Sequence, residues 1–336
     1  MLITGLAGFG KTYVAKQLKE YKEDTTLRLA FTNVSADNLA DDDIDSKTLC
    51  SHFGINFKTG KGSEKKLKNL KNIKCIMITE IFMTPSYIMN YLIKIKNAFP
   101  HIKFICEGDP EQTRPVKQEH INWIETQLLN NLCDGNMIKL KYNKRSNETE
   151  NYYKIIEGEP LCKTKFSNRS PRRVNIVRTN TKRVEINDIM MNLDKEPLIF
   201  IENIMNCKDL SGAEIYTTYH DKAQDILLSL ETPIMAIKNN KKINIKNGKM
   251  YKIININVDT IEIDTGFEKT LWFSKSQFME NFVVAYAFTN HKVQGITIKE
   301  KFNIYEWSKM SPRERYTAYS RTSDGENVKI ITGLNT

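Results

Sequence analysis

The sequence predicts an α/β protein in which two domains are built on parallel sheets and a small antiparallel β-barrel is inserted into the second. Apolar runs typical of strands alternate with helical stretches through the first half of the chain. This alternation favours a parallel sheet that is covered by helices on both faces. A second pattern of the same kind starts near residue 174 and returns near residues 282 and 328. Between its halves, short alternating runs are divided by turn residues, which indicates hairpins.

The elements of the first half follow from their apolar spacing. Residues 1–4 have the pattern of the end of a strand, and residues 13–21 carry apolar side chains at helical spacing. Helices are also expected around residues 45–52 and 85–98. Further strands are expected at residues 27–31, 75–78 and 104–106. Ligands bind beyond the carboxyl ends of parallel strands, so the polar motifs that follow these runs are candidate site residues.

A polar stretch at residues 143–171, with Ser, Asn, Arg and Pro, is predicted to be a linker or boundary. We therefore expect one domain at residues 1–148 and another at 149–336, with the inserted β-domain at 215–278. The second α/β pattern has expected strands at residues 174–177, 282–288 and 328–331. The alternating runs of the insert are residues 242–245, 250–258 and 260–263, divided by Asn247-Gly248 and Thr265-Gly266.

Composition limits the class of protein. The 336 residues include six cysteines that lie far apart without a CxxC pair, which argues against a zinc site or a disulfide framework and favours a reducing, intracellular compartment such as the cytoplasm, a viral replication site or the nucleus. No apolar run approaches the length of a membrane span, so no membrane partner is expected. The net charge of +10 suits a polyanionic partner, most simply nucleic acid.

The first dozen residues contain a full match to the phosphate-binding pattern GxxxxGK[ST], from Gly5 through Gly8 and Gly10 to Lys11 and Thr12. Backbone N–H groups of such a loop converge on phosphate oxygens, and the glycines allow a close approach. Lys11 is expected to reach the β- and γ-phosphates, and the Thr12 hydroxyl to ligate Mg²⁺. The predicted ligands are therefore ATP and Mg²⁺.

Two polar motifs follow later strands of this half. Glu80 stands where a general base is expected, and the preceding position, where Asp is expected to face Mg²⁺, is Thr79. A Thr hydroxyl can hold a metal-bound water but lacks the charge of Asp. Gln112 belongs to the segment 108–115, where it could hydrogen-bond a γ-phosphate or the attacking water.

The second half supplies donors and a candidate arginine finger. Residues 289–297 offer hydroxyl, amide, imidazole and ammonium groups, suited to nucleic-acid phosphates on one side and the nucleotide, near Gly295, on the other. Arg321 ends a predicted helix at residues 316–321, and Arg145 ends the run 140–145. Either guanidinium could stabilise charge that develops on a γ-phosphate.

In this order the motifs resemble superfamily 1 (1B) helicases, in particular the RecD-like and Dda-like DNA helicases of the PIF type. The resemblance implies two RecA-like P-loop NTPase domains with ATP in the cleft between them, and an SH3-like β-domain in the second. It further implies an enzyme that moves along single-stranded DNA, usually 5′ to 3′, and unwinds duplex. The residues that match strand-contacting motifs are Thr32, Asn33, His52, Thr289 and His291.

The chain departs from this family at Thr79, and only four residues precede the phosphate loop. The second departure leads us to expect either a fragment of a longer polypeptide or a member with relaxed preference for ATP over GTP. Expected partners include other replication or repair proteins or an upstream domain of the same polypeptide. The abundance of Lys, Asn and Ile indicates an AT-rich coding genome, which suits a virus or a mobile element. Two alternatives stay open: a viral-type superfamily 1 RNA helicase, and a nucleic-acid-binding module whose ATPase is impaired by Thr79.

Overall fold

The structure, a computed structural model, describes residues 1–56, 60–168, 171–194, 196, 198–208, 214–221, 223–266 and 270–332. Its internal contacts divide the chain into two units. Unit 1 comprises Met1–Leu161, Gln294–Thr297 and Ser311–Gly325, and unit 2 comprises Cys162–Val293, Ile298–Met310 and Glu326–Thr336. Within the described residues, no helix is long and apolar enough to cross a membrane.

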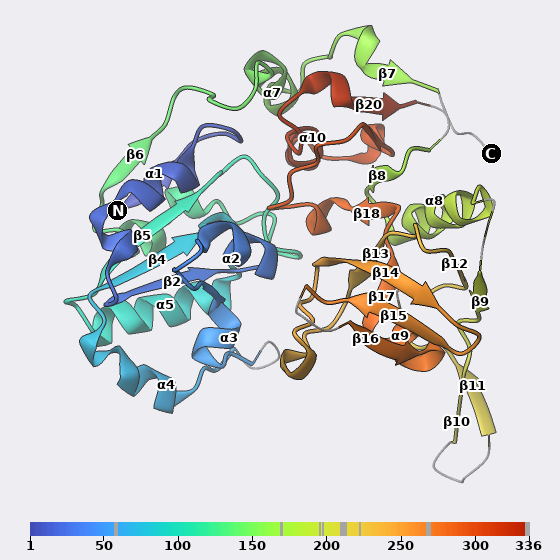
Figure 1. The fold of residues 1–336 in the computed structure, drawn as a ribbon. Coiled ribbons are helices and arrows are strands. Elements are labelled where there is room, and N and C mark those ends of the chain that lie inside the picture. Colours follow the sequence, from blue (N-terminus) through green and yellow to red (C-terminus); the bar gives the residue numbers. More distant parts are fainter. Residues whose placement is uncertain are drawn as a thin grey trace. The chain divides into compact units, whose positions relative to one another are not determined.

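Unit 1 is built on a parallel sheet of six strands in the order β3-β2-β4-β5-β1-β6 (Figure 1). The strands are β1 (Leu2–Thr4), β2 (Thr26–Ala30), β3 (Lys47–Thr48), β4 (Cys75–Thr79), β5 (Lys103–Gly108) and β6 (Met137–Lys139). The helices of this unit are α1 (Lys11–Gln17), α2 (Asn33–Leu39), α3 (Leu49–Phe53), α4 (Glu64–Lys68), α5 (Ser86–Ala98), α6 (Gln127–Leu132), α7 (Thr149–Glu157) and α10 (Pro312–Tyr319).

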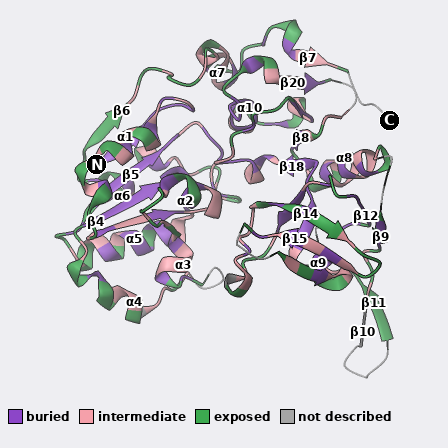
Figure 2. Cartoon of the chain, viewed as in Figure 1, coloured by how far each residue is buried: buried purple, intermediate pink, exposed green. Residues whose placement is uncertain are grey.

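Strand β4 shows why the sheet is covered on both faces. Every residue of β4 is buried, as Figure 2 shows for this part of the sheet. Ile76 and Ile78 belong to the core that includes α5, whereas Cys75 and Met77 belong to a second core with residues of α1 and α2. Because successive side chains of a strand point to opposite faces, an unbroken apolar run supplies both cores.

Unit 2 contains two larger sheets (Figure 1). The parallel sheet has the order β18-β8-β19-β20-β7, from strands β7 (Phe166–Ser167), β8 (Val174–Val177), β18 (Ala287–Thr289), β19 (Phe302–Ile304) and β20 (Val328–Ile331). The antiparallel sheet has the order β16-β15-β14-β13-β17, from β13 (Ile234–Ala236), β14 (Met250–Ile256), β15 (Thr260–Asp264), β16 (Leu271–Ser274) and β17 (Phe282–Val284). Helix α8 (Asn180–Asn192) packs against β8 and β18, and α9 (Lys275–Asn281) packs against β15, β16 and β17. Two further antiparallel pairs join β9 (Ile199–Ile201) to β12 (Ile226–Leu228) and β10 (Met205–Lys208) to β11 (Glu214–Thr217).

Three predicted elements were wrong in part. Residues 242–245 do not form a strand: a 3₁₀ turn at Lys241–Ile243 is followed by Asn244 in the left-handed region, with φ of 53°. The run 282–288 is divided between the two sheets of unit 2, because β17 pairs with β13 whereas β18 pairs with β8. The helix expected at 45–52 starts later, since the Thr48 hydroxyl caps α3 by accepting from the Ser51 N–H.

The polar stretch 143–171 is more than a linker. It contains α7, whose Tyr152 is fully buried and makes edge contacts with the rings of Tyr316 and Tyr319 on α10. Unit 1 accordingly continues to Leu161, beyond the expected end of the first domain at 148. The domain bounds 1–148, 149–336 and 215–278 stay predictions, and residues 57–59, 169–170, 195, 197, 209–213, 222, 267–269 and 333–336 within these spans lie outside the described residues.

Candidate active site

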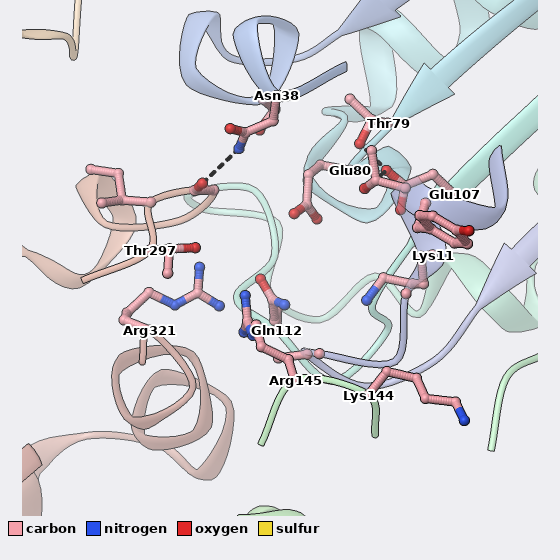
Figure 3. A pocket seen from close by; sticks show the side chains of 18 residues that line it. Lys11, Asn38, Thr79, Glu80, Glu107, Gln112, Lys144, Arg145, Thr297 and Arg321 are labelled. Atoms are coloured by element: carbon pink, nitrogen blue, oxygen red, sulfur yellow. Dashed lines mark hydrogen bonds between the residues drawn. The ribbon is translucent and has the colours of Figure 1, made fainter. Parts of the chain in front are cut away.

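A cavity of about 320 Å³ lies at the carboxyl ends of the strands in unit 1. Its wall comes from the loop after β1, from α2, from the ends of β4 and β5, and from segments far along the chain (Figure 3). The polar side chains that line it include Lys11, Thr12, Ser35, Asn38, Thr79, Glu80, Glu107, Gln112, Lys144, Arg145, Thr297 and Arg321. Each residue predicted for the nucleotide site lines this cavity except Gly5.

The loop before α1 is built from left-handed glycines. Gly8 has φ of 82° and Gly10 has φ of 84°, conformations that glycine adopts without steric cost. A Cβ atom at Gly8 would lie 2.5 Å from Asn143 Oδ1, so only a hydrogen fits there. Lys11 begins α1, is 9% exposed, and donates from Nζ to the Leu6 carbonyl oxygen at 3.0 Å. The Lys11 side chain therefore lies against the loop that precedes it, with its ammonium group bound to a loop carbonyl.

Two threonine hydroxyls donate hydrogen bonds to one carboxylate in the cavity lining. Thr12 Oγ1 donates to Glu107 Oε1 at 3.1 Å, and Thr79 Oγ1 donates to the same oxygen. Glu107 is 3% exposed and lies on β5, between the strand that precedes the phosphate loop and the strand that ends at Thr79. Burial raises the pKa of Glu107, whereas the Lys11 ammonium lowers it.

Glu80 has a strained backbone. Its φ of 55° and ψ of 44° lie in the left-handed region, which costs a residue with a Cβ about 1–3 kcal/mol. Such strain is concentrated at functional sites. Burial raises the pKa of the Glu80 carboxyl, and the Glu107 carboxylate raises it further. A carboxyl of raised pKa is a suitable general base near neutral pH.

Gln112 offers an unused acceptor to the cavity. Its Nε2 donates to Asp109 Oδ2 at 3.1 Å, and the side chain is 4% exposed. Its Oε1 is buried, and no donor in the described part of the chain reaches it. Buried polar atoms are normally hydrogen-bonded, so an orphan that lines a cavity indicates a place for a ligand or water.

Two arginines reach the cavity from distant segments. Arg321 lies just beyond α10 and is 5% exposed. It donates from Nε to the Thr317 carbonyl at 2.7 Å and from Nη2 to Ser320 Oγ at 2.9 Å. Arg145 is exposed, and its Nη2 donates to the Ser320 carbonyl at 3.2 Å. Burial lowers the pKa of Arg321, and the Glu80 carboxylate opposes this shift.

The segment 294–297 belongs to unit 1 and closes one side of the cavity. Gly295, with φ of 83°, accepts on its carbonyl from Asn38 Nδ2 at 2.8 Å (Figure 3). Gln294 Oε1 accepts from Thr113 Oγ1 at 2.6 Å. Gly295 is thereby held next to α2.

The predicted nucleic-acid contacts lie on both units. Thr32 caps α2, Asn33 begins that helix, and His52 lies in the last turn of α3. These helices follow the neighbouring strands β2 and β3, so all three residues lie at one edge of the sheet. Burial lowers the pKa of His52, as do the Lys47 and Lys66 ammonium groups. Thr289 ends β18 and His291 follows in a 3₁₀ turn, both in unit 2. Their role in binding stays a prediction.

Sequence reasoning missed several lining residues. Glu107 is an acid that follows the apolar run at 104–106, one residue before Gly108, and this position does not distinguish it from an acid at the surface. Asn38 belongs to no motif and is brought to the cavity by α2, whereas Lys144 and Thr297 lie within the segments 140–145 and 289–297 but were not singled out there.

The chain was compared with protein families, with curated proteins and with solved structures. The family model described as "AAA domain" matches residues 1–125. No curated protein matches the sequence. Structures of Pif1 helicases match nearly the whole chain, among them one of two coordinating Pif1 helicases at forked double-stranded DNA, with 20% identity and a TM-score of 0.73 over 98% of this chain and 87% of that one.

Two further matches agree. The Pif1 helicase from Bacteroides in complex with ADP-AlF3 and single-stranded DNA gives 20% identity and a TM-score of 0.71 over 100% of this chain and 89% of that one. The Pif1 helicase from Candida albicans gives 18% identity and a TM-score of 0.67 over 99% and 91%. The chain therefore has the α/β fold of these Pif1 helicase structures, and its first 125 residues match the AAA-domain model.

Proposed function

We propose that the chain is an ATP-dependent helicase that moves along single-stranded DNA, in the 5′ to 3′ direction. One observation carries the proposal: a single cavity collects the cation Lys11, the acid Glu80 and the buried guanidinium of Arg321. Phosphoryl transfer to water needs little covalent chemistry from the protein, since positioning and charge stabilisation account for most of the catalysis. These groups, from three separate parts of the chain, supply that machinery.

Each group has a role in the cleavage of the γ-phosphate by water. The Glu80 carboxylate accepts the proton of the attacking water, and Gln112 Oε1 accepts a hydrogen bond that orients it. Lys11 binds the β- and γ-phosphates. Arg321, and Arg145 beside it, stabilise the negative charge that builds up on the transferred group.

The donors near Thr12 fit Mg²⁺. They are oxygen atoms, which Mg²⁺ prefers, and no group of three or more His, Cys, Asp and Glu that could hold a metal occurs in the described ranges. Among the residues of the phosphate loop, the Thr12 hydroxyl would ligate the ion, together with water and phosphate oxygens. When bound, Mg²⁺ neutralises charge on the β- and γ-phosphates. Thr79 is the second residue proposed near it.

Single-stranded DNA is the proposed track. The net charge of +10 suits a nucleic-acid backbone. Bacteroides Pif1, which shares the fold, has been solved bound to single-stranded DNA. We assign the strand to Thr32, Asn33 and His52 on unit 1 and to Thr289 and His291 on unit 2. The antiparallel sheet of unit 2 is proposed as an SH3-like domain.

A second candidate function rests on Thr79. Because the position that usually supplies an acid near Mg²⁺ carries a hydroxyl, the chain could bind nucleic acid without turning over ATP. Strand binding would then survive Lys11→Ala, and the wild-type chain would hydrolyse no ATP.

Hydrolysis of ATP with Mg²⁺, measured with and without single-stranded DNA, separates these candidates. We expect hydrolysis that DNA stimulates and that Lys11→Ala abolishes. Bound DNA without turnover would favour the second candidate. Equal-length RNA, tested alongside, shows whether a 2′-OH preference makes the track RNA instead.

A further inference from the structure

A buried acid, Glu107, lies on the strand next to β4, whose own end lacks the expected acid. P-loop NTPases hold Mg²⁺ with the loop Ser or Thr and an Asp at a nearby strand end. Here that strand ends at Thr79. The ladder pairs Ile78 with Cys106, so the next residues, Thr79 and Glu107, lie side by side. On its other side, β5 pairs with β1, with Ile3 opposite Glu107. Glu107 thus lies between the phosphate-loop strand and the strand that lacks the acid.

The hydrogen bonds of Glu107 point to the metal position. Its Oε1 accepts from the Thr12 hydroxyl at 3.1 Å and from the Thr79 hydroxyl. Thr12 is the residue proposed above to ligate Mg²⁺, so the carboxylate lies within one hydrogen bond of that ligand. Figure 3 shows Thr79 and Glu107 together on the cavity wall. A residue that contacts both Thr12 and Thr79 can reach a cation that sits beside them.

The Glu107 carboxylate forms no salt bridge in the described ranges, although the Lys11 ammonium acts on it from farther away. Glu107 is 3% exposed, and no Lys, Arg or His in the described ranges comes within ion-pair distance of it. The Lys11 ammonium, the nearest candidate along the loop, donates to the Leu6 carbonyl. A buried carboxylate is costly unless it is paired or binds a metal. Its position on the cavity wall leaves room for a bound ion to provide the missing charge.

We propose that Glu107 takes the place of the missing strand-end acid, and that its carboxylate, with the Thr12 hydroxyl, holds the Mg²⁺ of Mg·ATP. The inference rests on the proposed function, since it assigns a residue to the metal of that site. Thr79 becomes a positioning residue, which keeps the Glu107 carboxylate in place through its hydroxyl. Glu80 is then left to accept the proton from water.

A purely structural role for Glu107 makes a different prediction. If it only ties β5 to β4 and to the phosphate loop, Glu107→Gln should be nearly neutral for metal binding, because the amide oxygen still accepts from both hydroxyls. If it binds the cation, the same change removes the charge that holds the ion. The metal affinity of Glu107→Gln therefore distinguishes the two roles.

The test uses Mn²⁺ as the probe, with free Mn²⁺ measured by electron paramagnetic resonance in the presence of ADP and the full chain. We expect Glu107→Gln to weaken Mn²⁺ binding by at least about tenfold. ADP binding in EDTA should stay within about twofold, since it depends on the loop. Glu125→Gln, an exposed acid elsewhere in unit 1, is the matched control and should bind Mn²⁺ as the wild type does.

Relocating the charge gives a second measurement. In the double variant Thr79→Asp with Glu107→Gln, the acid returns to β4, and Mn²⁺ affinity should recover to within about threefold of the wild type. Wild-type affinity in Glu107→Gln would overturn the inference. If Glu107→Gln does not fold, Glu107→Asp keeps the charge but shortens the side chain. This variant should bind Mn²⁺ several-fold more weakly than the wild type, and an unchanged Mn²⁺ affinity would overturn the inference. Failure of the wild type to bind ADP would instead contradict the proposed function.

Discussion

The Tyr316 hydroxyl donates to Asp109 Oδ2 at 2.5 Å, deep within unit 1. The same hydroxyl accepts from the backbone N–H of Ala7 at 2.7 Å. One buried oxygen on α10 therefore joins the phosphate loop to the loop that carries Gln112, since Asp109 also accepts from Gln112. The phosphate loop, the Gln112 loop and α10 are therefore held together by the same hydrogen bonds.

Tyr316→Phe should separate stability from turnover. It leaves the Ala7 N–H and one Asp109 oxygen without this partner, which should cost about 1–3 kcal/mol in the free energy of unfolding. Because Gln112 loses its support, kcat should fall more than the affinity for ATP. Tyr21→Phe is the control: its buried hydroxyl donates to the Leu39 carbonyl at 2.7 Å, outside the cavity lining. Equal losses of kcat in both variants would contradict the proposed role.

The two arginines should contribute unequally. Arg321 is buried and donates hydrogen bonds to Thr317 and Ser320, whereas Arg145 is exposed. We expect Arg321→Ala to lower kcat by roughly a thousandfold, as for an arginine finger, with ATP affinity changed by less than about tenfold. Arg145→Ala should cost less, because an exposed guanidinium is screened by water. Single-turnover hydrolysis and nucleotide titration together measure both effects, and a larger loss for Arg145→Ala would reverse the assignment.

Two substitutions of Glu80 should lower activity alike but differ in their effect on stability. Glu80→Asn and Glu80→Gln both remove the carboxylate, so each should lower kcat by about 10²- to 10⁴-fold. Asn tolerates the left-handed conformation better than Gln does. Urea unfolding should therefore find the Asn variant more stable than the Gln variant, by up to about 1 kcal/mol. If the two variants unfold at the same urea concentration, the backbone strain at Glu80 has no energetic consequence.

The free energy of unfolding should decrease at acidic pH because of His52. Its folded-state pKa is lowered by burial and by Lys47 and Lys66, so the folded chain keeps the imidazole neutral. As the pH falls through the unfolded value near 6.5, the unfolded state binds a proton that the folded state does not, and stability is lost. His52→Gln should therefore reduce the decline in unfolding free energy between about pH 7 and pH 5. An unchanged decline would show that His52 titrates normally.

Apolar runs predicted β1, β2, β4 and β5 of the sheet in unit 1, and β8 and β20 in unit 2, because buried parallel strands appear in the sequence as continuous apolar segments. The division of residues 282–288 between two sheets could not be predicted, because an apolar run does not indicate which sheet its residues join. The Asn-Gly turn was recognisable, but residues 242–245 alternate as a strand would and fold as a 3₁₀ turn.

Most of the cavity could be predicted because its residues belong to motifs with fixed chemistry. Glu107 could not, because its role depends on a pairing between strands far apart in sequence, β4 and β5. A lone acid at the end of an apolar run has the same appearance whether it faces solvent or the phosphate loop. Only the register of the sheet distinguishes the two.

Strand displacement tests the central claim most directly. A duplex with a 5′ single-stranded tail and one with a 3′ tail are incubated with the chain, Mg²⁺ and ATP, with Lys11→Ala as the blank. We predict ATP-dependent separation of the 5′-tailed duplex and no separation by Lys11→Ala. If the chain hydrolyses ATP and binds the tails yet separates neither duplex, it is not a helicase.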